Sequence, residues 1–168
     1  MTNPIIKINV KGLGSMTAEL YPQKAPITVA NFIKLAKNGF YEGLIFHRVI
    51  RGFMIQGGCY TEDMQDTACD SIRGEFRANG FPANDIKHTR GVLSMARTSM
   101  PNSASSQFFV MHKDSPHLDG QYAAFGKLTD GFDVLDAIAS TETGNYGWYM
   151  QDVPTTPIVI ESVEVISE

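Results

Sequence analysis

The residues best suited to chemistry lie in one short segment, residues 46–58, which reads FHRVIRGFMIQGG. Within it, Arg48 supplies a permanent positive charge with a rigid fork of N–H donors, and Gln56 supplies an amide. Phe53 and Met54 add two large apolar side chains beside them. Such a set can hold an apolar ring while the cation reaches a neighbouring amide. The segment has no evident nucleophile, which narrows the chemistry to non-covalent steps.

Strand alternation decides which of these side chains can act together, because successive side chains of a β-strand point to opposite faces. Met54 and Gln56 therefore share one face of their strand. On the preceding strand, Arg48 lies on the face opposite to that of its neighbours His47 and Val49.

A later segment, residues 105–110 (SSQFFV), supplies a second polar and apolar pair. Gln107 and Phe109 share one face of this expected strand. Phe108 and Val110 take the other face, which we expect to be the core.

Other kinds of catalytic site find little support. No Gly-x-Ser-x-Gly elbow of a serine hydrolase occurs. The histidines lack a recognised metal-ligand spacing, and the acidic residues after position 60 lack the pattern of an EF-hand loop. We therefore expect no metal and no cofactor. The residues concerned are His47, His88, His112, His117, Glu62, Asp63, Asp66 and Asp70.

Composition indicates an ordinary globular chain, with 168 residues, 43% hydrophobic and 19% charged. We expect one domain, residues 1–168. The net charge of −4 with scattered Lys and Arg argues against nucleic acid as a partner. No apolar run approaches the ~20 residues of a membrane span. Residues 1–10 alternate like a strand, so we expect a cytoplasmic protein in which Cys59 and Cys69 are free thiols.

The elements that must position these residues are mainly strands. Apolar alternation and turn residues predict a strand, a turn at Arg51–Gly52 and a second strand within residues 44–56. Residues 57–90 should be long loops with a short strand around 72–76, and residues 144–155 should be loop. The remaining strands are expected at residues 5–10, 16–20, 92–97, 106–111, 122–127 and 158–166.

Two helices complete the expected fold. Residues 26–38 carry an apolar stripe at helical spacing, with Pro26 in the first turn and Gly39 after the end. Residues 132–139 give a second, shorter helix. About eight strands without a helix after each favour a mainly β fold, a closed antiparallel barrel.

The chain resembles the cyclophilins, a family of peptidyl-prolyl cis–trans isomerases. The likeness runs from the first strand to the last. It is carried by TVANFIKLAKNGFYEGLIFHR (28–48), FHRVIRGFMIQGG (46–58), GVLSMAR (91–97), SSQFFV (105–110) and LDGQYAAFGKLTDGFDVLDAI (118–138). The resemblance implies an eight-stranded antiparallel barrel capped by two α-helices, with a substrate groove on its outer wall.

The resemblance also implies roles for individual residues. Arg48 would be catalytic, and Gln56 would bond the substrate backbone and brace the arginine. Arg97 would bind the peptide mainly through its main chain. The residues implied to enclose the proline ring are Phe53, Met54, Phe109 and Leu118, and those implied to line the groove are Ala96, Arg97 and Gln107.

The chain departs from the family pattern at the proline pocket. His117 stands where well-studied eukaryotic members carry Trp, and Tyr122 stands where they carry His. We expect Tyr122 to keep a hydrogen-bonding role and His117 to weaken the binding of cyclosporin-type ligands. Arg97 replaces a usual Asn. No family residue carries over onto residues 59–70.

The resemblance implies an enzyme that accelerates rotation about Xaa-Pro bonds during protein folding. Its partners would be proline-containing segments of unfolded or flexible proteins, bound by a monomer. Two other hypotheses remain open here. One is a non-enzymatic proline-peptide binding module or holdase, against which the retention of Arg48 argues. The other is a redox-regulated scaffold working through Cys59 and Cys69.

Overall fold

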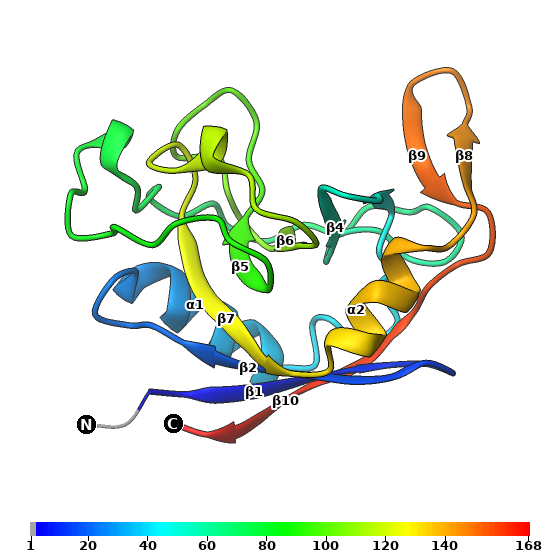
Figure 1. The fold of residues 1–168 in the computed structure, drawn as a ribbon, viewed down its shortest axis with the longest axis horizontal. Helices are drawn as coiled ribbons and strands as arrows, with labels where there is room; N and C mark the ends of the chain where they lie inside the picture. Colours follow the sequence, from blue (N-terminus) through cyan, green and yellow to red (C-terminus); the bar gives the residue numbers. More distant parts are fainter. Residues whose placement is uncertain (1–2) are drawn as a thin grey trace.

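The structure, a computed structural model, describes residues 3–168. An eight-stranded antiparallel sheet of order β10-β1-β2-β7-β5-β6-β4-β3 curls round on itself (Figure 1). This is the expected mainly β barrel. Its strands are β1 (Ile5–Val10), β2 (Gly14–Leu20), β3 (Arg48–Ile50), β4 (Met54–Gly57), β5 (Val92–Met95), β6 (Phe108–Met111), β7 (Ala124–Asp130) and β10 (Ile160–Ser167).

The barrel is joined between its two edge strands, β3 and β10, by irregular chain. Ile45 and Val159, which precede these strands, form an isolated antiparallel bridge. The backbone N–H of Ile160 donates to the carbonyl of Leu44 at 2.7 Å. Within residues 3–168 no ladder links β3 to β10. The barrel prediction is confirmed, although the barrel is not fully closed by strand pairing between β3 and β10.

Two α-helices, α1 (Pro26–Lys37) and α2 (Phe132–Ala139), complete the barrel and match the expected ranges. Pro26 occupies the first turn of α1, where its missing N–H costs nothing. Lys34 and Lys37 lie in the last turn, where positive charge is favourable. α1 packs beside β10, whereas α2 lies against β2, β3 and β4. Residues 3–168 contain no helix long and apolar enough to cross a bilayer.

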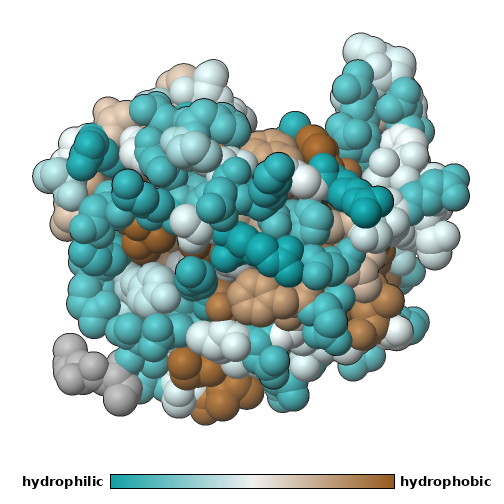
Figure 2. Space-filling model, in the orientation of Figure 1, coloured by the Kyte–Doolittle hydropathy of each residue, from teal (hydrophilic) through white to brown (hydrophobic). Residues whose placement is uncertain are grey.

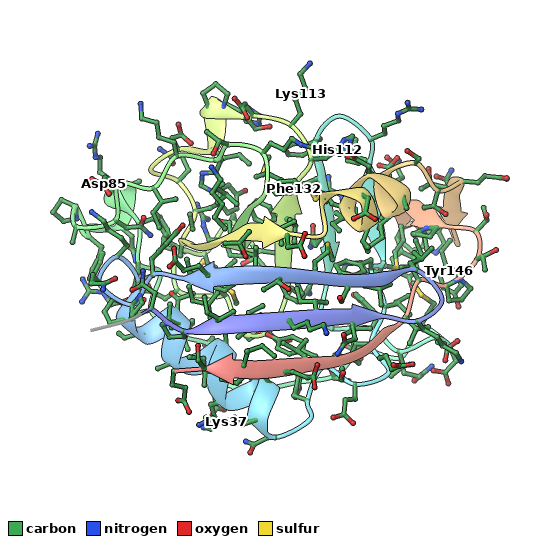
Figure 3. The ribbon with its side chains drawn as sticks, turned by 60° about the horizontal axis from the view of Figure 1, so that its bottom comes forward. Lys37, Asp85, His112, Lys113, Phe132 and Tyr146 are labelled. Carbon is green, nitrogen blue, oxygen red and sulfur yellow. The ribbon has the colours of Figure 1, made fainter. Side chains whose placement is uncertain are left out.

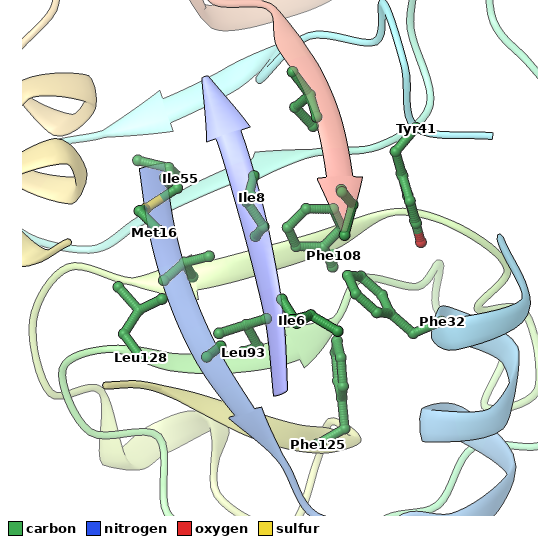
Figure 4. Packing of buried hydrophobic residues seen from close by; sticks show 14 of the residues in the cluster. Ile6, Ile8, Met16, Phe32, Tyr41, Ile55, Leu93, Phe108, Phe125 and Leu128 are labelled. Carbon is green, nitrogen blue, oxygen red and sulfur yellow. The ribbon is translucent and has the colours of Figure 1, made fainter. Parts of the chain in front are cut away.

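The core lies inside the curled sheet, where alternate residues of β1 and β2 are buried. Phe32 of α1 points into it and contacts several aromatic rings, including Phe108 edge-on at 5.4 Å between ring centroids (Figure 4). A second, smaller apolar cluster lies apart from this core. Its buried members are Met54, Val92, Phe109, Met111, Leu118 and Ala124.

The prediction of a strand around residues 72–76 was wrong. This segment has no strand pairing, and its backbone groups bond to single partners in a facing loop. The N–H of Ile72 donates to the carbonyl of Ala104, and that of Gly74 donates to the side chain of Asn102. The apolar residues that indicated a strand serve instead to pack irregular chain against the core.

The prediction of loop at residues 144–155 was also wrong. The segment forms a separate two-stranded antiparallel hairpin, β8 (Thr143–Tyr146) and β9 (Met150–Pro154). Gly147, with φ of 63°, lies in its turn. The hairpin was missed because its strands lack apolar alternation: β8 has no buried residue, and the apolar residues of β9 lie at its two ends. It projects from the body of the molecule at the upper right of Figure 1.

Candidate active site

The β3–β4 hairpin brings the first candidate residues together. Arg48 pairs directly opposite Gln56 in the strand register. The Nη1 of Arg48 lies 3.4 Å from the Oε1 of Gln56, a long contact that leaves the guanidinium available to a substrate. Both side chains border a notch of about 120 Å³. The notch is lined by Arg48, Phe53, Met54, Gln56, Ala96, Arg97, Phe109, Leu118 and Tyr122.

The floor of the notch is apolar. Met54, Phe109 and Leu118 are almost fully buried and belong to the smaller cluster outside the main core. Phe108 and Val110 lie in the main core. The strand alternation inferred from sequence is therefore confirmed, since neighbouring residues of β6 serve the notch and the core in turn.

A chain of amides lies along one side of the notch. The Nε2 of Gln56 donates to the Oε1 of Gln107 at 2.9 Å. Gln107 itself lines an adjoining hollow of about 140 Å³, together with Gln56, Ala96 and Arg97. Gln107 thus fixes the amide orientation of Gln56, whose oxygen faces Arg48.

Phe53 is held in place by the end of β6. The N–H of Gly52, in the turn before Phe53, donates to the Nδ1 of His112 at 2.8 Å. The N–H of His112 donates to the carbonyl of Phe53 at 2.9 Å. His112 lies beside α2 (Figure 3). Its Nε2 lies 3.0 Å from the Oδ1 of Asp136 on that helix, and its Nδ1 accepts from Gly52, so Nε2 carries the proton. His112 therefore ties the turn that carries Phe53 to α2.

The side chain of Arg97 is engaged within the protein. Its Nη2 donates to the carbonyl of Gln121 at 2.6 Å, and its Nη1 donates to the carbonyl of Thr98 at 3.0 Å. The guanidinium carbon lies 4.7 Å from the ring centroids of both Phe76 and Tyr122. These contacts occupy the guanidinium of Arg97 within the protein.

The two departures from the family pattern occupy different positions. Tyr122 lines the notch and meets Phe109 edge-on at 5.8 Å between centroids. His117 is exposed at the rim and does not line the notch. Its ring lies 5.8 Å from that of Phe53 at an angle of 31°.

A buried polar network behind the notch was missed by sequence reasoning. The Nε2 of His88 lies 2.8 Å from the Oγ of Ser94, and its Nδ1 lies 3.2 Å from the Oδ1 of Asp119. The ring of His88 stacks on Phe109 at 6.0 Å. Burial lowers the pKa of His88, although the bond to Asp119 opposes this. With His88 and Ser94 buried, the trio lies behind Phe109 and offers no accessible nucleophile.

His47, beside Arg48, carries no charge at neutral pH. Burial, with a smaller contribution from the charge of Arg48, lowers its pKa from 6.5 to about 4. His47 therefore adds no second positive charge beside the guanidinium of Arg48.

A larger hollow of about 510 Å³ lies on the other side of the 119–121 loop. It is lined mainly by polar and charged residues. Size does not select the site, because a hollow of about 530 Å³ beside α1 is larger still. We assign the site to the smaller notch, where apolar walls for a proline ring lie next to the guanidinium of Arg48. Over residues 3–168 no group of three or more His, Cys, Asp or Glu is arranged to hold a metal ion.

Comparisons with known proteins agree with this geometry. The family model of the cyclophilin type peptidyl-prolyl cis-trans isomerases matches residues 5–165. A peptidyl-prolyl cis-trans isomerase of Acinetobacter baylyi is 43% identical over 99% of this chain and 88% of its own. Peptidyl-prolyl cis-trans isomerase B of Escherichia coli is 43% identical over 90% and 94%.

Solved structures give the same result. A cyclophilin type peptidyl-prolyl cis-trans isomerase of Cryptosporidium parvum superposes with a TM-score of 0.81 at 29% identity, over 99% of both chains. A second structure of that protein, in the presence of the dipeptide Ala-Pro, gives a TM-score of 0.80 at 30% identity over 98% of this chain and 99% of its own.

The chain belongs to the cyclophilin family. Its activity is that of the family, the cis–trans isomerisation of peptidyl-prolyl bonds. The enzyme hypothesis from the sequence is therefore confirmed against the non-enzymatic binding module.

Proposed function

We propose that Arg48 is the catalytic residue and that the notch around it binds the proline of an Xaa-Pro bond. The observation that carries the proposal is the placement of one exposed guanidinium at the rim of an apolar notch. Phe53, Met54, Phe109 and Leu118 would enclose the ring. Gln56 and the main chain of Ala96 and Arg97, with Gln107, would hold the backbone on one side.

The chemistry follows from the electronic structure of the imide bond. Its partial double-bond character gives a barrier of roughly 18–20 kcal/mol and exchange times of tens to hundreds of seconds. When the bond twists, conjugation is lost and the prolyl nitrogen regains a lone pair. A guanidinium donor aimed at this nitrogen binds more strongly as the twist proceeds, and only such differential binding accelerates the step.

The required stabilisation is modest. A turnover of about 10³ s⁻¹ needs roughly five decades of acceleration, or about 7 kcal/mol at 1.36 kcal/mol per decade. A fixed apolar ring, a few amides and one cation in a water-poor notch can provide this without a covalent step. The apolar walls of the notch also strengthen the field of Arg48 by excluding water.

The natural substrates we propose are exposed proline-containing segments of unfolded or flexible proteins. We further propose that the whole chain, residues 1–168, acts as one domain, as a monomer, in the cytoplasm, and without nucleic acid, membrane, metal or cofactor. A main core that draws on both helices and the curled sheet, a site lined by residues of one chain and two unpaired cysteines support this. We also propose reduced affinity for cyclosporin, because His117 offers a smaller ring than an indole.

The role of Arg48 is tested by following cis–trans exchange of an Ala-Pro peptide by NMR. Arg48→Lys should slow catalysed exchange by about 10²-fold or more, because an ammonium lacks the planar fork of donors. Arg51→Lys is the matched control, since Arg51 is an exposed arginine three residues away that does not line the notch. Near-normal exchange with Arg48→Lys would refute the proposed role.

A further inference from the structure

The β8–β9 hairpin is the feature that the isomerase site leaves unexplained. It stands clear of the rest of the surface at the upper right of Figure 2. Its strand β9 runs beside β3, the strand that begins with Arg48. The hairpin is thus an arm next to the site, although its own residues do not line the proline notch.

The tip of this arm exposes aromatic side chains. Trp148, the single tryptophan of the chain, is 95% exposed, and Tyr149 is 63% exposed. Their ring centroids lie 5.6 Å apart at an angle of 70°. Large aromatic rings are normally at least partly covered, so a solvent-exposed pair is typical of a surface that meets a partner.

A cavity of about 290 Å³ lies between the arm and β3. The residues that line it are His47, Arg48, Tyr149, Met150, Gln151 and Asp152. It is larger than the notch of about 120 Å³ that would take the proline ring. Arg48 lines both spaces, so a peptide that leaves the notch past Arg48 enters this cavity directly.

Two local features set this cavity apart from an ordinary surface hollow. The Nδ1 of His47 is the one buried side-chain nitrogen or oxygen in residues 3–168 that has no hydrogen-bond partner. Asp152 holds φ of 61°, in the left-handed region that residues other than glycine rarely adopt. Unpartnered buried groups and strained backbone are both concentrated at binding sites.

We propose that this cavity and the aromatic tip form a second subsite for the same client polypeptide. It takes an aromatic or large apolar side chain within a few residues of the proline, on the flank that leaves the notch past Arg48. Tyr149 and Trp148 pack against that side chain, and Met150 adds apolar surface. The inference rests on the proposed function, because it requires the proline to bind beside Arg48.

The occupant is a client chain for a physical reason. Unfolded segments expose the aromatic and apolar residues that a folded partner would bury. The cavity has one cation, Arg48, and one carboxylate, Asp152, so it has no net charge to select a strongly charged ligand. The arm would therefore favour prolines that lie near aromatic residues.

The kinetic test uses peptides of Gly and Ser around a central Ala-Pro, in which one Phe is moved through the four positions on each side. In the wild type, Phe on one flank should raise kcat/KM by about five- to tenfold over the Phe-free peptide. In the double variant Trp148→Ala, Tyr149→Ala this ratio should fall to about one. The matched control is Tyr146→Ala, an exposed aromatic of the same hairpin outside the cavity, which should keep the ratio.

The single tryptophan provides a second test that needs no variant. Isomerisation does not consume the peptide, so binding can be titrated with the active enzyme. A Phe-bearing peptide should shift the Trp148 emission to shorter wavelength and protect it from acrylamide quenching. The Phe-free peptide should do neither.

The outcomes separate this inference from the function on which it rests. If the wild type accelerates exchange of no peptide, the isomerase proposal fails. If exchange is accelerated but Phe gives no gain at any position, the subsite is refuted. The subsite is also refuted if the gain from Phe survives in the double variant, or if the Phe-bearing peptide does not change the Trp148 emission.

Discussion

His47 shows how a single side chain makes the stability of this protein depend on pH. Its pKa is 6.5 in an ordinary environment and about 4 in the fold, because burial disfavours the charged ring. The neutral form is therefore present in the folded protein at neutral pH. As the pH falls below 6.5, the unfolded chain takes up the proton first, so stability is lost until the pH reaches about 4.

The loss of stability between pH 6.5 and about 4 can be measured. At about 1.36 kcal/mol for each pH unit between these two values, the loss amounts to about 3 kcal/mol. His47→Phe keeps a ring at this position but has no titrating group, so its unfolding free energy should fall less steeply between pH 6.5 and 4. Urea denaturation at several pH values compares the two proteins. Parallel pH profiles would show that His47 is protonated equally in both states.

His117 should limit the affinity for cyclosporin. The exposed ring rests on Phe53 at the rim of the notch and offers little apolar surface. His117→Trp should tighten cyclosporin binding by about tenfold, since a larger aromatic surface adds about 1–2 kcal/mol. Isothermal titration calorimetry of the two proteins measures this. An unchanged dissociation constant would indicate that the indole is not what such ligands need here.

At the residue scale, sequence reasoning succeeded where strand alternation decides the outcome. It placed Met54 with Gln56 and separated Phe109 from its core neighbours. It missed the contact of His88 with Ser94 and Asp119, because these residues meet only through the pairing of β5 and the return of a loop. Spacings of 6 and 31 residues carry no signal of that contact.

At the scale of elements, α1 depends on a carboxylate from a distant loop. Its first residues have no side-chain cap of their own. The fully buried Glu75 accepts hydrogen bonds from the N–H groups of Ile27 and Thr28 at 3.1 and 2.7 Å, and from the hydroxyl of Thr28 at 2.8 Å. Negative charge at a helix N-terminus is favourable, so this contact fixes the helix to the loop.

Glu75→Gln should therefore destabilise the protein by about 1–3 kcal/mol, because the amide removes the charge and one acceptor. The matched control is Glu161→Gln, an exposed position on β10, where the change should be within about 0.5 kcal/mol. Chemical denaturation followed by far-UV circular dichroism measures both. Equal stability of the two variants would contradict the capping role.

The elements that were predicted correctly from the sequence share a regular spacing of apolar residues. α1, α2, β1 and the β3–β4 pair each bury one face against a common core, so their apolar residues recur at regular spacing. The β8–β9 hairpin buries little and is held by its own pairing and by β3. Its sequence therefore lacks the regular spacing of apolar residues that indicates a strand, and its tip stays exposed.

At the scale of the whole molecule, we expect the two cysteines to pack the fold and not to act as a redox switch. Both are free thiols; Cys59 is buried, and Cys69 packs against the main core. The Sγ of Cys59 donates to the carbonyl of Thr67 at 3.6 Å. Limited access should protect both thiols from oxidation.

Treatment with a mild disulfide-forming oxidant should therefore leave the catalysed exchange rate within about twofold of its starting value, since access governs thiol oxidation. The variant Cys59→Ser, Cys69→Ser treated in the same way controls for oxidation of methionine. Rapid inactivation that dithiothreitol reverses, absent from this variant, would support the redox scaffold instead.

One practical consequence follows from the exposure of Trp148. Trp148 is already 95% exposed in the folded protein, so denaturation barely changes its surroundings. Tryptophan fluorescence would therefore change little while the barrel unfolds. An experimenter who relied on that signal would mistake an unfolded sample for an intact one. Circular dichroism of the tyrosine band is the better choice, because Tyr41 is 1% exposed and lies against Phe32 and Phe108.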